Sequence, residues 1–263
     1  MRIHHLNCGS MRSVEPTREG LPSIPAVNHC LLAETDHGLV LVETGLGLGN
    51  VRDPAGTLDP SWVAQVEPAL EEEETAIRQI ERMGFDATDV RHVVLTHLDV
   101  DHCGGLPDFL GAAVHVLAGE LEAALREAPS LRYRPAHWTH GPRWRAHEST
   151  NDRWFGFDAV RPADLPEIRL VPLGGHSAGH AGVAVHDGDR WLLHCGDAYY
   201  YHRELDEDPE PHPLFDVIQT RSAVDHDRRV GTQAALRALA RDHSAEVTLF
   251  SAHDPWEFGR LTG

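Results

Sequence analysis

Four side chains that can bind a metal ion lie within six residues of this chain, in the run Thr96-His97-Leu98-Asp99-Val100-Asp101-His102-Cys103-Gly104-Gly105. The run follows an apolar stretch at 91–96 that predicts a strand, and it ends in two glycines. Ligands spaced this densely converge most readily on a loop, where side chains on both faces can turn to one point. Imidazole and carboxylate together suit zinc, iron or manganese, and such a cluster could hold two ions. The run therefore predicts a metal centre at the end of a strand.

Three later residues of ligand type strengthen this prediction. His176 stands in Gly174-Gly175-His176-Ser177-Ala178-Gly179-His180, directly after a predicted strand at 168–173. Asp197 follows a strand at 190–195, and His253 closes one at 247–251. Because each comes at the C-terminal end of its strand, all three can lie on one rim of a two-sheet core, where a rigid scaffold positions ligands.

The other apolar and helical patterns define the fold class. Further strands are predicted at 29–34, 39–43, 113–117 and 182–186, and helices at 71–83, 120–127 and 231–242. Strands interleaved with helices in this way are typical of an α/β sandwich in which helices cover the sheets. The segment 45–68 is expected to be a loop. The segment 128–166, which holds Trp138, Trp144, Trp154 and several arginines, is expected to be a lid or a substrate-contacting insertion.

Composition excludes several classes of function. All 23 basic residues are arginine, so the chain has no lysine for a Schiff base, for pyridoxal phosphate or for a phosphate-binding loop. The formal net charge of −18 argues against a general nucleic-acid partner. The chain has no apolar run of ~20 residues, so no membrane partner is expected, and its N-terminus lacks a secretory signal, so we expect a cytoplasmic protein. The four cysteines form no C-x-x-C pair, and 20 histidines again indicate metal.

The ordered ligands resemble the metallo-β-lactamase superfamily, whose pattern is H-x-H-x-D-H-x-G-G, then G-H, G-D and a late histidine. The resemblance extends from Leu39–Gly45 to His253. Within the superfamily, the N-acyl-homoserine-lactone lactonases look most similar in length, in the G-H-x-x-G-H stretch and in Asp197-x-x-Tyr200. The resemblance implies a four-layer αββα sandwich, a single domain over residues 1–263 with an insertion at about 128–166, a dinuclear metal site and a homodimer.

The resemblance also assigns roles to residues. It implies that Asp197 bridges two divalent ions, zinc being favoured, and that a hydroxide between them attacks a carbonyl. The implied ligands of metal one are His97, Asp99 and His176, and those of metal two are Asp101, His102 and His253. Asp101 and Tyr200 are the candidate catalytic residues, with Tyr200 as a hydrogen-bond donor to the developing oxyanion, although Tyr199 or Tyr201 could point inward instead. His180 is expected to orient a ligand.

Two departures from the family pattern affect the choice of metal. Asp99 stands where the family has its second histidine, and Glu43 stands where it has the aspartate of D-T-G. A carboxylate in site one makes that site harder, which keeps iron or manganese as alternatives to zinc, unless Asp99 fails to bind. The flavodiiron branch of the family carries a glutamate at this position.

The sequence leaves several functions open. The first is a metal-dependent hydrolase that opens a lactone or related carboxylic ester of small-molecule size. Thioester hydrolysis would use the same residues. An iron-dependent oxidoreductase of the same fold is the alternative that Asp99 suggests, although the flavodoxin partner domain of the flavodiiron branch is not seen in this chain. A non-catalytic binding protein that kept the fold is a further reading.

Overall fold

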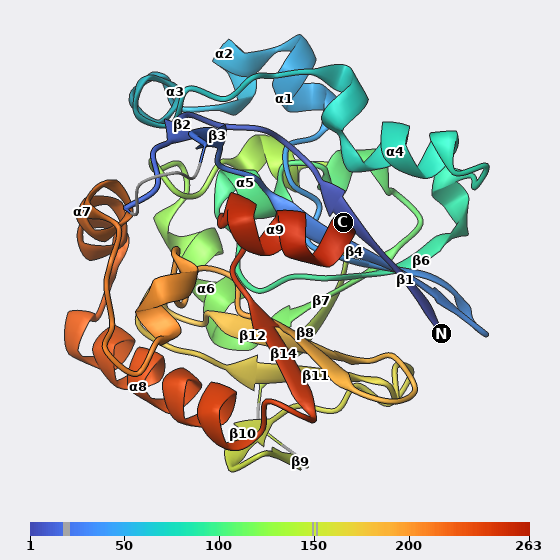
Figure 1. Ribbon diagram of the computed structural model, residues 1–263. Coiled ribbons are helices and arrows are strands. Elements are labelled where there is room, and N and C mark those ends of the chain that lie inside the picture. The colour runs from blue at the N-terminus through green and yellow to red at the C-terminus, as the bar shows by residue number, and fades with distance from the viewer. Residues whose placement is uncertain (18–21, 149, 151) are drawn as a thin grey trace.

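Two β-sheets packed face to face form the centre of the molecule, and helices cover their outer faces (Figure 1). The computed structural model describes residues 1–17, 22–148, 150 and 152–263. The larger sheet has the strand order β1-β4-β5-β6-β7-β8. Its strands are β1 (Arg2–Asn7), β4 (His29–Thr35), β5 (Gly38–Val42), β6 (Val90–Val94), β7 (Ala113–Leu117) and β8 (Arg143–His147). The pairs β1/β4 and β4/β5 are antiparallel, and the pairs from β5 to β8 are parallel.

The smaller sheet has the strand order β11-β12-β13-β14. Its strands are β11 (Ile168–Pro172), β12 (Ala181–His186), β13 (Trp191–His194) and β14 (Val247–Phe250). The last pair is parallel and the other two are antiparallel. Two short antiparallel pairs join β2 (Ser13–Val14) to β3 (Ile24–Pro25) and β9 (Asp152–Trp154) to β10 (Phe157–Ala159).

The inner faces of the two sheets share one apolar core. Leu31 and Val42 of the larger sheet pack against Leu170, Val183 and Phe250 of the smaller one, and all five are fully buried. Side chains two residues apart on a strand point to the same face, so the alternate residues of these strands face outward. The strand β5 is apolar on both faces because helices cover the outer face of the sheet as well.

The outer layers complete a four-layer sandwich. The helices α4 (Ala76–Arg82) and α6 (Ala118–Glu127) bury Ile80 and Ala123 against the larger sheet, and α8 (His226–Asp242) buries Leu236 against the smaller one (Figure 1). The other helical segments are α1 (Leu48–Arg52), α2 (Pro54–Thr57), α3 (Pro60–Val66), α5 (Val100–Cys103), α7 (Pro213–Ser222), α9 (Pro255–Thr262), η1 (Glu72–Glu74), η2 (Ala87–Asp89), η3 (Leu106–Asp108), η4 (Pro135–His137) and η5 (His202–Leu205). The αββα architecture expected from the sequence is confirmed. Across the described ranges, no helix combines the length and apolarity needed to cross a lipid bilayer.

The segment 45–68 is helical, so the expectation of a loop was wrong. It folds into α1, α2 and α3, and the last two each begin with a proline that follows an aspartate cap. Proline is well suited to the first turn of a helix, where its missing N–H would have no partner. The glycines and prolines that suggested a loop therefore mark helix ends. The helix expected at 71–83 is also divided, because extended Thr75 separates η1 from α4.

The segment 128–166 contributes strands to the sheet framework. It supplies β8, which pairs in parallel with β7, and the β9–β10 hairpin. Trp138 and Trp144 pack on the core of the larger sheet, and Trp154 packs on that of the smaller sheet. Residues 149 and 151 of this segment lie outside the described residues.

Some of the 20 histidines of the chain are packed in the buried core. His5 Nδ1 and His29 Nε2 lie 2.8 Å apart, and His194 Nε2 donates to the carbonyl oxygen of His29 at 2.6 Å. Burial lowers the pKa of His5 to about 4 and holds the pKa of His29 well below its ordinary value. These rings are therefore neutral in the folded protein at pH 7, and they fill space beside Phe250.

This cluster predicts a loss of stability in mild acid. Between about pH 6.5 and pH 4 the unfolded chain protonates these histidines and the folded chain does not, so the free energy of unfolding falls as the pH is lowered. The substitution His5→Gln should lower the number of protons taken up on unfolding by up to one. The substitution His37→Gln, in an exposed turn, should leave that number unchanged. Urea unfolding of the metal-free protein at pH 7 and pH 5 measures the difference. Equal pH dependence in His5→Gln and the unmodified protein would contradict the assignment.

Candidate metal centre

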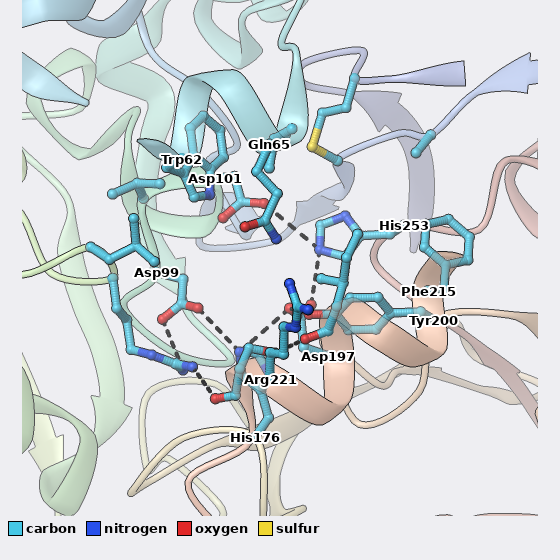
Figure 2. Close-up of a pocket in the computed structure, with 18 of the residues that line it drawn as sticks. Trp62, Gln65, Asp99, Asp101, His176, Asp197, Tyr200, Phe215, Arg221 and His253 are labelled. Atoms are coloured by element: carbon cyan, nitrogen blue, oxygen red, sulfur yellow. Dashed lines mark hydrogen bonds and ion pairs between the residues drawn. The ribbon is translucent and has the colours of Figure 1, made fainter. Parts of the chain in front are cut away.

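The C-terminal ends of four strands bring the predicted ligands to one rim of the sandwich. The chain leaves β6 into residues 95–104, and it leaves β11, β13 and β14 at the residues before His176, Asp197 and His253. Figure 2 shows Asp99, Asp101, His176, Asp197 and His253 pointing into one hollow. All of these side chains are largely buried. The edge where the strands end thus forms the floor of a polar site.

The two carboxylate oxygens of Asp197 divide the histidines into two pairs. Oδ2 lies 3.9 Å from His97 Nε2 and 3.5 Å from His176 Nε2. Oδ1 lies 3.2 Å from His102 Nε2 and 3.0 Å from His253 Nε2. One carboxylate that faces two imidazole pairs has the arrangement of a bridging ligand, and these are the two pairs that the family pattern implied.

A second carboxylate accompanies each pair. Asp99 Oδ2 lies 3.1 Å from His176 Nε2 and 3.5 Å from His97 Nε2. Asp101 lies 3.9 Å from His102 Nε2 through Oδ1 and 3.8 Å from His253 Nε2 through Oδ2. The structure thus brings all seven predicted ligand residues together in the two expected sets; that they bind metal stays a prediction.

The unsatisfied polar atoms of this cluster fit two divalent cations. Within the described residues, His97 Nε2, His102 Nε2 and Asp197 Oδ1 are buried without a hydrogen bond of ordinary geometry. A buried polar atom without a partner costs about 1–3 kcal/mol, so three such atoms aimed at one hollow indicate a missing ligand. Imidazole nitrogens and carboxylate oxygens are donors that zinc, iron and manganese accept.

Charge leads to the same conclusion. Burial alone would lower the pKa of His102, yet the carboxylates of Asp197, Glu43 and Asp101 together raise it well above its ordinary value. The pKa of His253 is raised in the same way: burial would lower it, and Asp197 and Asp101 together more than offset burial. The negative charge that raises these pKa values is charge that bound divalent ions would balance.

Arg132 compensates the carboxylate that stands in the place of a histidine. Its Nη1 lies 3.1 Å from Asp99 Oδ1, and its Nη2 donates to the carbonyl oxygen of Ser222 at 2.6 Å. Burial would raise the pKa of Asp99, and Arg132 and the neighbouring histidines instead hold it well below its ordinary value. Asp99 departs from the family pattern, and its partner lies 33 positions further along the chain, too far away to be recognised from the sequence alone.

Glu43 holds His102 in position through an unusual backbone. Its φ of +63° lies in the left-handed region, which residues other than glycine rarely adopt. In this conformation its carboxylate accepts the N–H of Thr96 at 2.6 Å and a hydrogen bond from His102 Nδ1. The bond from Nδ1 leaves the Nε2 lone pair of His102 directed at the hollow, which is the usual device for orienting a metal-bound histidine.

Glu120 ties the two ligand-bearing loops together, a role that the sequence did not reveal. Its Oε1 accepts the N–H of Leu98 and the hydroxyl of Tyr133, both at 3.0 Å. Its Oε2 accepts the hydroxyl of Ser177 at 2.6 Å and the N–H of Gly179 at 3.0 Å. Glycine is required at 179 because a Cβ there would lie 2.2 Å from the backbone nitrogen of Glu120. One buried carboxylate thus sets the spacing between the 97–102 and 173–180 loops.

His180 supports Asp197 from behind. Its Nδ1 donates to the carbonyl oxygen of Leu173 at 2.8 Å, so its Nε2 can accept the backbone N–H of Asp197 at 3.0 Å. Gly196, at φ +53°, lets the chain turn here, because a Cβ would lie 2.6 Å from His180 Nε2. His180 therefore lies behind the ligands rather than among them.

Tyr200 is the tyrosine that faces the hollow. Its hydroxyl donates to Asp197 Oδ2 at 2.6 Å, whereas Tyr199 bonds to Glu257 and Tyr201 to Thr17. Burial, together with the charge of Asp197, raises the pKa of Tyr200 well above its ordinary value. The phenol therefore stays protonated and able to donate throughout the neutral range.

The run 97–103 was expected to be a loop, but part of it is helical. Val100–Cys103 forms the single helical turn α5, whose N-cap is Asp99. This turn places Asp101 and His102 at consecutive positions, where His102 Nε2 faces both the Asp101 and the Asp197 carboxylates. Cys103 is fully buried with its thiol on the carbonyl oxygen of Leu98, and burial raises its pKa well above the ordinary value, so it is packing material.

A cavity of about 470 Å³ opens above the ligands. Trp62 of α3 and Phe215 of α7 lie on opposite sides of it (Figure 2). Arg12 and Arg221 add positive charge to its lining. The apolar remainder of its wall includes Met11, Val14, Ala26, Val66, Leu131, Leu214, Ile218 and Val224. Among the described residues of the segment 128–166, those that line this cavity are 130–132.

Comparisons with known proteins agree with this geometry. The sequence model of the metallo-beta-lactamase superfamily matches residues 24–236. The chain is 40% identical over 261 residues to a probable metallo-hydrolase of Mycobacterium tuberculosis, a match that covers 97% of this chain and 81% of that protein. It is 25% identical over 204 residues to the N-acyl homoserine lactonase AiiA of Bacillus thuringiensis subsp. kurstaki, covering 74% and 72% of the two chains. A crystal structure of a B. thuringiensis AiiA variant with N-decanoyl-L-homoserine at its active site superposes with a TM-score of 0.73 at 20% identity, covering 98% and 95%.

The bridging role of Glu120 is testable through metal affinity. In Glu120→Gln one oxygen is replaced by an NH₂ group, which would oppose two of the four donors, so the two ligand loops should separate. We expect a 10- to 100-fold loss of zinc affinity, as for other groups that orient ligands. Competition with a chromophoric chelator measures this affinity, and Glu122→Gln on the exposed face of the same helix is the matched control. Unchanged affinity in Glu120→Gln would refute the role.

Proposed function

The chain belongs to the metallo-β-lactamase superfamily, and on this premise we propose that it is a metal-dependent hydrolase that opens a lactone or a related carboxylic ester. The observation that carries the proposal is the position of Tyr200 beside the shared carboxylate of Asp197, under an apolar cavity. A hydrogen-bond donor fixed next to two sets of metal ligands suits a reaction in which negative charge develops on a carbonyl oxygen.

The metal-binding roles divide as the distances suggest. His97, Asp99 and His176 would hold one ion, and Asp197 would be shared with the second. The second set is Asp101, His102 and His253. Two divalent ions held here would supply a Lewis acid for the carbonyl oxygen and a water of lowered pKa as nucleophile.

The chain's own residues supply orientation and charge. If Asp197 held a metal ion, its Oδ2 would no longer have to accept the hydrogen bond from Tyr200. The tyrosine hydroxyl could then turn to a substrate carbonyl oxygen and donate a hydrogen bond to the developing charge. Asp101 lies on the other side of Asp197, at the pair His102 and His253, where it can accept a hydrogen bond from an attacking water. Glu43 keeps His102 from turning away during the reaction.

The shape of the cavity favours a substrate with an apolar tail. Trp62, Met11, Leu131 and Phe215 offer apolar surface within reach of the ligands, which suits an acyl or alkyl chain. The lactonases named above act on acylated homoserine lactones, and the similarity to them favours a cyclic ester over an open one or a thioester.

Zinc is the metal that we propose. A lone carboxylate at Asp99 would favour iron or manganese, and it would keep an iron oxidoreductase as the second candidate. The ion pair with Arg132 offsets that charge, so site one carries about the same net charge as a site with a neutral histidine. The observation that would favour the oxidoreductase is iron held tightly by the isolated protein.

A lactone panel tests the proposal directly. Protein loaded with zinc, iron or manganese is incubated with N-acyl homoserine lactones and simple γ-lactones, and ring opening is followed by the proton that it releases. We expect hydrolysis by the loaded protein and a loss of at least about 10³-fold in His102→Ala, because both a ligand and its orientation by Glu43 disappear. Equal rates in the two proteins, or no lactone opened with any metal, would refute the proposed activity.

The role of Tyr200 is separable from metal binding. Tyr200→Phe keeps the ring and removes the donor, so kcat should fall about 10²- to 10³-fold while zinc content stays unchanged. Tyr201→Phe removes a neighbouring buried hydroxyl that bonds to Thr17 and should leave kcat near that of the unmodified enzyme. Steady-state kinetics on the best lactone of the panel gives the comparison. Equal kcat in Tyr200→Phe and the unmodified enzyme would remove the tyrosine from the reaction.

A further inference from the structure

A second histidine cluster lies on the larger sheet, away from the strand ends that form the candidate metal centre. His92 on β6, His115 on β7 and His147 on β8 stand on three adjacent parallel strands. The register pairs Val94 with His115 and Leu117 with His147. Each histidine therefore stands two residues further along its strand than the histidine on the preceding strand. His92 points to the same face as Val94, which is the inner face of the sheet.

The three rings form a continuous chain of contacts. His92 Nδ1 lies 3.0 Å from His115 Nε2, and His115 Nδ1 lies 3.2 Å from His147 Nε2. The rings of His115 and His147 are stacked, with an interplanar angle of 17°. Asp164, in the connection between β10 and β11, brings its Oδ2 to 3.9 Å from His92 Nδ1. The cluster therefore joins three strands of one sheet to a connection that leads into the other.

We propose that His92, His115 and Asp164 form a second metal site, which takes one zinc ion with water completing its coordination. One ring nitrogen of His92, one ring nitrogen of His115 and one carboxylate oxygen of Asp164 all lie within 4.8 Å of one another. Ligand atoms 2.0–2.1 Å from a tetrahedral zinc ion lie about 3.4 Å apart, so a small movement of the Asp164 side chain closes the site. Two imidazoles and one carboxylate are a donor set that zinc accepts in proteins.

His147 has the position of a group that orients a ligand. If His115 donates its Nδ1–H to His147 Nε2, its own Nε2 carries a lone pair that faces His92 and Asp164. Metal-bound histidines generally donate their other N–H in this manner. Zinc then replaces the proton that His92 Nδ1 shares with His115, and that proton moves to the other nitrogen of the His92 ring. No net charge is lost from the protein in this exchange.

The surroundings suit a cation with access to solvent. His115 is fully buried, whereas the side chains of His92 and Asp164 are 15% and 48% exposed, so an ion can enter from the Asp164 side. Burial lowers the pKa of His92, and it lowers that of His115 to about 4, which leaves both rings unprotonated and able to bind metal at neutral pH. The charges of Arg143 and Arg145 near the cluster are opposed by those of Asp164 and Glu167.

Zinc content of matched variants tests the proposal. The double variant His92→Gln/Asp164→Asn removes two donors, and the control His37→Gln/Asp36→Asn removes the same residue types from an exposed turn. Each metal-free protein is equilibrated with zinc, passed through gel filtration and analysed for metal. We expect one zinc ion fewer per chain in the double variant than in the control, whatever the candidate metal centre holds, and equal lactone hydrolysis by both.

Two further measurements keep the result interpretable. Asp164→Asn alone changes an exposed side chain. It should lower the affinity for the most weakly bound zinc ion by about tenfold or more, as measured by chelator competition. In His102→Ala the same zinc ion should remain, since its donors lie outside the candidate metal centre. Equal zinc content in the double variant and its control, or a zinc affinity that Asp164→Asn does not change, would show that the three histidines form a hydrogen-bonded chain only and overturn the proposal.

Discussion

The fold around the candidate metal centre depends on one constraint, which is that several carboxylates are buried together where two sheets meet. Asp99, Asp101 and Asp197 share a single hollow. Charges of one sign brought this close and out of water cost several kcal/mol each unless cations face them. The strand ends, the α5 turn and the short 173–180 loop therefore act together: they place imidazole nitrogens against these oxygens, in positions that would suit bound metal ions. The apolar sandwich below holds the geometry, but the carboxylates determine which geometry is needed.

The groups behind the ligands follow from the same constraint. Glu43 and Glu120 are themselves buried acids, and each accepts hydrogen bonds on both of its carboxylate oxygens from donors in or beside the ligand-bearing segments. A carboxylate that accepts several such bonds is a strong and directional tie, because bonds to an ionised acceptor are about twice as strong as neutral ones. The centre is thus positioned by an outer ring of acids that are satisfied within the protein, and its inner ring is left for metal.

The sequence predicted which side chains meet at the candidate metal centre because each stands just after an apolar strand, a local pattern that needs no knowledge of distant contacts. The α/β sandwich followed from the same strands, and its four layers were implied by the resemblance to the metallo-β-lactamase superfamily. What it could not reveal depends on contacts between distant segments. Glu120 resembles any helix acid until Leu98 and Gly179 are brought to it. Likewise, the glycines and prolines of 45–68 gave a loop signal because helix caps and loops use the same residues.

The pairing of Asp99 with Arg132 shows how a change of ligand type can leave the chemistry of a site intact. A carboxylate in place of an imidazole adds one negative charge to metal site one, and Arg132 returns the balance from a segment outside the metal-binding motif. The same arginine donates to the carbonyl oxygen of Ser222 at the end of α7, so it also joins the 130–132 stretch to the opposite wall of the cavity. The charge of the candidate metal centre and the wall of the cavity above it are therefore linked through one side chain. A ligand motif read alone would assign this site to a harder metal, whereas the ion pair makes its net charge that of the ordinary histidine site.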